Sequence, residues 1–98
     1  MKISLLKYGS VISDQKVGDQ IYTEIKSVIN SHNKCVIDLT DVKSMATFNA
    51  KQIFGKLYLE LGSEGFFNII EIQNASNDLK LIIRLGIQSA VDDSISTC

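Results

Sequence analysis

The sequence predicts a single α/β domain in which helices cover a largely parallel sheet. Three short runs of β-compatible composition alternate with three segments whose apolar residues recur every three or four positions, and this alternation is typical of a parallel sheet. The chain has 98 residues, of which 45% are hydrophobic, so it can form one domain with a compact core. We expect the domain to cover residues 1–98, with 92–98 as a frayed polar tail.

The opening third of the chain predicts the first strand and the first helix. Residues 2–8 have β-compatible composition, and 11–12 can extend the strand after a bend. Ser13 or Asp14 caps a helix, because either side chain can accept hydrogen bonds from free backbone N–H groups. The apolar face of this helix consists of residues three and four positions apart: Val17, Ile21, Ile25, Val28 and Ile29.

A buried strand and a second amphipathic helix form the middle of the chain. The apolar run 35–39 indicates a strand that is covered on both faces, and Cys35 is a small buried hydrophobe within it. Residues 40–46 form a loop, and the second helix runs over 49–61 and ends at Gly62. The core side of this helix carries five apolar residues: Ala50, Ile53, Phe54, Leu57 and Leu61.

The last third predicts a strand at 67–72, after a turn at 63–65, and a helix at 76–91. The core stripe of this helix comprises small and aliphatic residues: Leu79, Ile82, Ile83, Gly86, Ile87 and Ala90. Leu81 and Leu85 lie off that stripe, which makes them a candidate homodimer surface. The alternative is that both side chains fill a second buried face of the helix.

Composition and charge exclude several classes of function. Ten basic and eleven acidic residues give a net charge of −1, whereas binding to nucleic acid needs clustered positive charge. One His and two distant Cys cannot supply a zinc site, and we expect neither a metal nor a cofactor. No apolar run approaches the roughly 18 residues of a membrane span, and the first apolar stretch is too short for a signal peptide. A cytoplasmic protein without nucleic-acid or membrane partners is therefore expected.

The segment 36–48 resembles the central motif of STAS domains, the family of anti-sigma-factor antagonists. That motif runs from an apolar strand through Asp-Leu-Ser to a Ser-containing helix start, and 38–40 reads Asp-Leu-Thr here. The pair Thr47-Phe48, followed by Phe-Gly-Lys-Leu at 54–57, is more closely similar to a STAS-like subgroup of undefined function. The resemblance extends over about 13–91. It implies a four-stranded, mostly parallel sheet with three main helices and an antiparallel first strand at the edge.

The resemblance also points to a modification site. In the family, the first Ser of an Asp-Ser-Ser-Gly motif accepts a phosphate from a partner kinase that also acts as an anti-sigma factor. That position falls on Thr47, while Ala46, Phe48 and Asn49 replace the other residues of the motif. Thr47 is therefore a candidate phosphoacceptor. The alternative is that its hydroxyl only caps the helix.

Polar side chains gather where two strands of the predicted sheet end. Ligands of open α/β sheets bind at the carboxyl ends of the strands. The candidate partner or ligand surface comprises residues after these strands and at the start of the second helix: Asp38, Thr40, Asp41, Phe48, Asn49, Lys51, Asn74 and Ser76. The alternative is that Asp38 satisfies backbone donors in its loop and that the other polar residues are caps.

These observations predict a non-catalytic, STAS-like protein-interaction module of bacterial signalling. Its expected partner is a histidine-kinase-like ATPase or an anti-sigma factor, and phosphorylation of Thr47 would switch the contact. The alternative is a small-ligand or nucleotide sensor at the crevice beside Asp38, Thr40 and Asn74. An enzyme is not expected, because the sequence assembles neither a nucleophile with a base nor a carboxylate pair.

Overall fold

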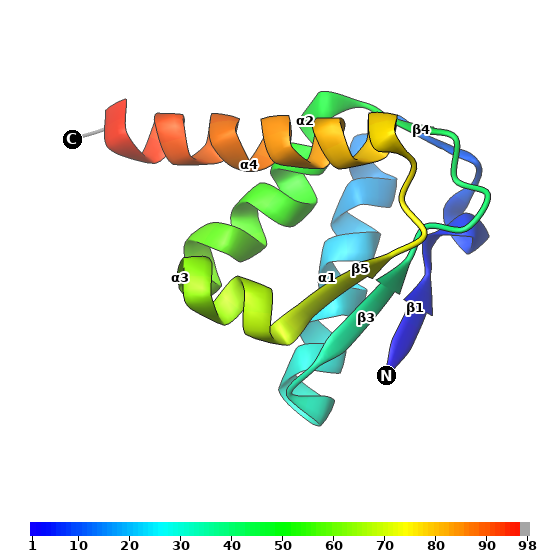
Figure 1. Cartoon of the computed structure of the whole chain (residues 1–98), viewed down its shortest axis with the longest axis horizontal. Helices are drawn as coiled ribbons and strands as arrows, with labels where there is room; N and C mark the ends of the chain where they lie inside the picture. Colours follow the sequence, from blue (N-terminus) through cyan, green and yellow to red (C-terminus); the bar gives the residue numbers. More distant parts are fainter. Residues whose placement is uncertain (97–98) are drawn as a thin grey trace.

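The computed structural model describes residues 1–96 and contains a three-stranded parallel sheet, a separate pair of short strands, and helices that pack beside the sheet (Figure 1). The elements follow one another in this order: β1 (Lys2–Ser4), the 3-10 turn η1 (Leu5–Tyr8), β2 (Val11–Ile12), α1 (Gln15–His32), β3 (Cys35–Asp38), β4 (Ser44–Met45), α2 (Thr47–Ala50), the π-helical turn η2 (Lys51–Gly55), α3 (Lys56–Ile69), β5 (Ile70–Gln73) and α4 (Asn77–Ser96).

The sheet has the strand order β1-β3-β5, and both pairs of neighbours are parallel. Ile3, Ile37 and Ile72 lie in one row across it. β1 is an edge strand, as expected, but the predicted antiparallel orientation is wrong. The helix α1 connects β1 and β2 to β3 and returns the chain to the end of the sheet where it began, which gives a parallel pair.

The predicted count of four strands in one sheet is also wrong. The strand expected at 2–8 ends at Ser4, because the chain coils into η1 and buries Leu5. β2 instead pairs in parallel with β4, in the segment that was expected to be a loop, so that Ile12 lies opposite Met45. Both residues are buried, and their burial explains why these two short segments pair.

One face of the sheet carries helices, and no helix within residues 1–96 covers the other (Figure 1). Along β3 buried residues alternate with partly exposed ones, and Val36 and Asp38 are on the partly exposed side. The prediction that both faces of 35–39 are covered is therefore wrong. Lys2 and Glu71 share the open face with Val36, since all three occupy one register position.

The first helix confirms the sequence prediction. Asp14 is its N-cap, and the carboxylate accepts hydrogen bonds from the N–H groups of Lys16 and Val17 at 2.7 and 3.2 Å. The helix ends at Asn33, which adopts the left-handed conformation with φ 61°. The predicted apolar face points into the core.

The second helical segment is longer than predicted. It starts at Thr47 and includes the π-helical turn η2. It is interrupted at Gly62, whose φ of 77° and ψ of 165° are not helical, and helix then resumes to Ile69. The strand predicted at 67–72 therefore begins only at Ile70. The Ile70 N–H still donates to the Phe66 carbonyl, and Phe66 is buried in helical conformation, so packing of this aromatic side chain favours helix over strand.

The last helix starts as predicted and ends later. Ser76 precedes it, and its hydroxyl accepts a hydrogen bond from the Leu79 N–H at 3.1 Å. Helical structure continues to Ser96, beyond the end predicted at residue 91, and fraying of the tail stays a prediction. A hydrogen bond from Gln88 to Asp92 at 2.9 Å, one turn apart, supports this end. Residues 97–98 of the predicted tail lie outside the described residues.

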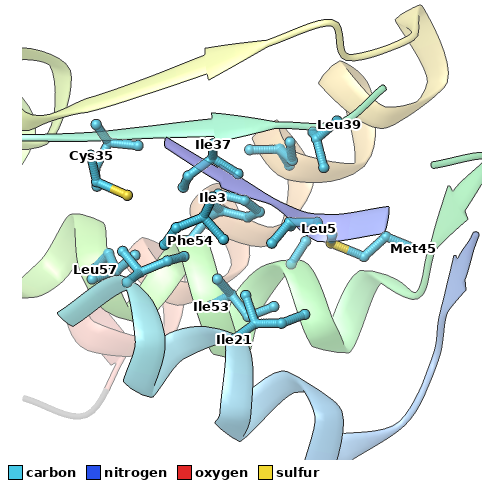
Figure 2. Packing of buried hydrophobic residues seen from close by; sticks show 14 of the residues in the cluster. Ile3, Leu5, Ile21, Cys35, Ile37, Leu39, Met45, Ile53, Phe54 and Leu57 are labelled. Atoms are coloured by element: carbon cyan, nitrogen blue, oxygen red, sulfur yellow. The ribbon is translucent and has the colours of Figure 1, made fainter. Parts of the chain in front are cut away.

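The core lies between the sheet and the helices (Figure 2). Figure 2 shows Ile3 and Ile37 of the sheet pointing toward Phe54 of η2, while Ile53 points toward Ile21 of α1. Cys35 is fully buried, as predicted, and burial raises the pKa of its thiol. Within residues 1–96, none of the helices combines the length and the hydrophobicity needed to span a membrane.

Candidate functional site

The carboxylate of Asp38 joins the loops that follow β3 and β5. Its Oδ1 accepts hydrogen bonds from the Thr40 N–H at 3.0 Å, the Thr40 hydroxyl at 2.7 Å and the Asn74 side-chain amide at 2.9 Å. The Lys2 ammonium lies 3.6 Å from Oδ2. Hydrogen bonds from Asn74 and Thr40 hold the pKa of Asp38 well below its usual range. The structure thus brings together three residues of the predicted surface.

The donors around Asp38 come from the chain itself. This arrangement agrees with the alternative in which Asp38 satisfies donors of its own loop. Binding of a ligand at this carboxylate stays a prediction. No group of three or more potential metal-ligating side chains occurs within residues 1–96.

Asp41 and Ser76 lie apart from this hydrogen-bonded cluster. Both line a hollow of about 590 Å³ beside Lys43 and Asp78. Asp41 adopts a left-handed backbone conformation with φ 63°, which suits an Asp in a tight turn. The predicted polar surface is therefore divided into the Asp38 cluster and this neighbouring hollow.

Thr47 is exposed at the start of α2 and does not cap the helix. The N-cap is Ala46, whose carbonyl oxygen accepts hydrogen bonds from Asn49 at 3.0 Å and Ala50 at 3.1 Å. Helix therefore begins one residue earlier than capping by Thr47 requires, and the predicted cap role of Thr47 is wrong. Thr47 is the first residue inside the helix, so its exposed hydroxyl does not occupy the capping position, while Phe48 beside it is 52% exposed.

Asn49 belongs to the interior and not to the predicted surface. It is fully buried, and its amide donates to the Asp14 carbonyl at 3.0 Å and to the Gln52 side-chain oxygen at 3.2 Å. Gln52 in turn donates to the Gln15 carbonyl at 2.9 Å. Asn49 is one helical turn from Ile53 on the inward face of the helix, which explains its burial. Its Oδ1 has no hydrogen-bond partner among the described residues.

Gly18 makes room for this polar contact between α1 and α2. A Cβ atom at Gly18 would lie 2.0 Å from the Gln52 Oε1 and 2.7 Å from the Asn49 Nδ2. Sequence reasoning missed the link between the two helices. The spacing of Asn49 and Gln52, together with a glycine inside the first amphipathic helix, could have indicated a close approach.

Lys51, Leu81 and Leu85 retain exposed surface. Lys51 forms an ion pair with Asp93 and thus links η2 to α4. Leu81 and Leu85 are 52% and 48% exposed, so the alternative that they fill a second buried face is wrong. The homodimer through these two leucines stays a prediction.

Comparisons with known proteins identify the family. Residues 17–80 match the family model described as STAS-like domain of unknown function (DUF4325). Comparisons with curated proteins and with solved structures gave no match. The matched region is well over half of the chain and includes β3, the Asp38 loop and the start of α2. The chain therefore belongs to the family of STAS-like domains of unknown function.

Proposed function

We propose that this domain is a non-catalytic regulatory module that binds a protein partner through the start of α2, and that phosphorylation of Thr47 switches this binding. The proposal rests on one observation above all, an exposed hydroxyl that is not used for capping, next to an exposed aromatic side chain. The matched family is described as a STAS-like domain of unknown function. The regulatory role and the position of the phosphoacceptor both come from the resemblance to anti-sigma-factor antagonists.

The segment that presents Thr47 is held on two sides. The N–H of Ala46 donates to the Ile12 carbonyl at 2.8 Å, and the N–H of Lys43 donates to the Ser10 carbonyl at 2.8 Å. Asn49 binds the Asp14 carbonyl on the other side. A surface that is already ordered loses less conformational entropy when a partner docks. This order favours a binding surface over a loop that changes shape.

Phe48 supplies the apolar anchor. Aromatic side chains that fill a pocket of the partner carry much of the binding energy of many interfaces. A phosphate on the neighbouring Thr47 adds about 1.5 to 2 negative charges. Those charges would have to lose their hydration next to an apolar pocket, so modification is expected to weaken the complex.

A histidine-kinase-like ATPase with anti-sigma activity is the partner that fits this scheme. It would transfer the γ-phosphoryl group of ATP to the Thr47 hydroxyl, which loses its proton, and leave ADP. The small-ligand or nucleotide sensor is the second candidate function. It is less well supported, because the central carboxylate of that crevice, Asp38, already accepts three hydrogen bonds from its own chain.

The first experiment tests the phosphoacceptor. The protein is incubated with ATP and a histidine-kinase-like ATPase from the same genome, and intact mass reports the number of phosphates. We expect one phosphate on the wild type and on Thr23→Ala, an exposed threonine of α1, and none on Thr47→Ala. A phosphate that remains on Thr47→Ala would refute the assignment.

The second experiment tests the binding surface with the same partner. Thr47→Glu places a negative charge beside the apolar anchor, and Phe48→Ala removes the anchor itself. Each variant is expected to weaken binding about tenfold or more, which corresponds to at least about 1.4 kcal/mol. Leu59→Ala is the control, because Leu59 is an exposed apolar residue on α3. Equal affinities for all three variants would contradict the proposed surface.

A further inference from the structure

A groove between α3, β5 and α4 combines aromatic walls with two cations. It has a volume of about 340 Å³. Tyr58, Phe66 and Phe67 form a ring cluster on its α3 side, with centroid separations of 5.4 to 6.4 Å. Phe66 is buried, but Phe67 is 71% exposed, so the cluster reaches from the core to the mouth of the groove. The lining residues come from α3, β5 and α4, whose arrangement Figure 1 shows.

The charge of the groove is unbalanced. Lys80 and Arg84 are one helical turn apart on α4 and both line it. Neither takes part in an ion pair within residues 1–96, and none of the lining residues is acidic. A complementary occupant therefore carries an apolar group for the ring cluster and negative charge for the two cations.

The groove borders β5, whose outer edge pairs with no other strand among residues 1–96. β5 is the last strand in the order β1-β3-β5. The Gln73 carbonyl accepts a hydrogen bond from the Leu39 N–H at 2.9 Å, so the backbone of Gln73 faces β3. Neighbouring residues in a strand present their N–H and C=O groups to opposite sides, so Ile72 presents its own to the free edge. The Ile72 side chain lines the groove.

We propose that this groove binds an extended peptide segment of a partner protein, which pairs as an additional strand with β5. The backbone of the peptide forms hydrogen bonds with Ile72, an aliphatic side chain packs on Phe67, and an acidic side chain pairs with Lys80 and Arg84. A peptide fits better than a small molecule, because the free edge offers both a donor and an acceptor in strand geometry.

The alternation of side chains along a strand specifies the pattern of the peptide. Residues two apart point to the same face, so the aliphatic anchor at position i and the acidic residue at i+2 both face the helices. Position i+1 points to the open face of the sheet, where Glu71 is exposed. Glu71 disfavours an acidic residue at i+1. The preferred peptide therefore has an aliphatic residue at i, a neutral or basic residue at i+1 and an acidic residue at i+2.

The test uses two synthetic octapeptides of identical composition, labelled with a fluorophore. In one, acidic residues stand two and four positions after an isoleucine. In the other, they stand one and three positions after it. We expect the first to bind at least tenfold more tightly by fluorescence anisotropy, and to lose affinity as salt screens the cations. Methylation of the peptide nitrogen opposite Ile72 is expected to abolish binding, since it removes the donor of the added strand.

Variants of the protein locate the contact. Phe67→Ser and the double variant Lys80→Glu/Arg84→Glu are expected to weaken binding at least tenfold. Leu81→Ser, on the same helix but outside the groove, and Thr47→Ala should bind as the wild type does. Because Thr47→Ala leaves this contact intact, failure of the phosphorylation scheme and failure of the peptide site are distinguishable.

The proposal is overturned if neither octapeptide binds, if both bind equally, or if the groove variants bind like the wild type. Tight binding of octanoate, an aliphatic carboxylate without a backbone, in competition with the peptide would likewise reject strand addition and assign the groove to small amphipathic molecules.

Discussion

The side-chain amide of Asn49 donates a hydrogen bond to the backbone carbonyl of Asp14 at 3.0 Å, and so ties the start of α2 to the N-cap of α1. Asn49 is fully buried, in a core that is otherwise apolar. A buried polar group of this kind fixes the relative position of two helices, because the bond forms in one arrangement only.

Replacement of Asn49 by Ala is expected to destabilise the domain by about 1 to 3 kcal/mol, since it removes two hydrogen bonds and leaves a void. Urea unfolding followed by circular dichroism measures the change. Asn30→Ala, at an exposed position of α1, is the control and should stay within about 0.5 kcal/mol of the wild type. Equal stabilities of Asn49→Ala and the control would show that the buried bond contributes nothing.

Replacement of Gly86 by Ala is expected to destabilise by about 1 to 3 kcal/mol through overpacking. A Cβ atom there would lie 2.6 Å from the backbone carbon and the Cβ of Ala50, so α4 and α2 would have to separate. Gly65→Ala is the matched control, because its Cβ would meet Leu61 at an ordinary 3.5 Å. Thermal unfolding should show a lower melting temperature for Gly86→Ala and an unchanged one for Gly65→Ala. A similar loss in both variants would mean that helix packing is not the cause.

Gly62→Ala tests backbone strain in the absence of a steric clash. Nothing lies within 4 Å of a Cβ atom at this position, yet its φ of 77° and ψ of 165° suit glycine alone. We expect a loss of about 1 to 3 kcal/mol in the free energy of unfolding. Ser63→Ala, at the next exposed position, should be neutral. A neutral Gly62→Ala would mean that α3 can continue through this residue.

The stability of the domain is expected to fall in acid partly through Asp38. Its pKa is lowered on folding, so its contribution is complete above the unfolded pKa of about 4 and is lost as pH falls through the folded value. Asp38→Asn should therefore be less stable than the wild type at pH 7 and lose less stability between about pH 5 and pH 2. Asp41→Asn, an exposed acid of the same loop, should retain the acid sensitivity of the wild type. Urea midpoints measured across this pH range show whether Asp38→Asn is less sensitive to acid than the wild type and Asp41→Asn.

Much of the fold could be predicted because it depends on local patterns. The spacing of apolar residues and the cap at Asp14 located α1, and the alternation of elements indicated parallel pairing of β3 and β5. The start of α4 follows from the Ser76 cap. These features are set by residues a few positions apart, so the sequence contains the necessary information.

The errors concern contacts between distant segments. Pairing of β2 with β4 joins residues that are more than thirty positions apart, and no local pattern marks it. Phe66 and Phe67 have β-compatible composition, but burial of Phe66 keeps 63–69 helical. Packing against the rest of the molecule overrides local propensity in both cases.

The candidate site was likewise predicted only in part. The proximity of Asp38, Thr40 and Asn74 follows from the rule that parallel strands end at one edge, and it was predicted. The burial of Asn49 was not predicted, because a polar side chain at a helix start gives no sign of a partner thirty-five positions away.

The three backbone hydrogen bonds from the 43–46 segment to Ser10 and Ile12 have a practical consequence for where this domain can be cut. The family match begins at residue 17, but Ile3, Leu5 and Ile12 contribute to the core from outside it. A fragment that starts at the matched boundary would lose both the edge strand and the support for the Thr47 turn. Shortened versions intended for binding studies therefore have to retain the first sixteen residues.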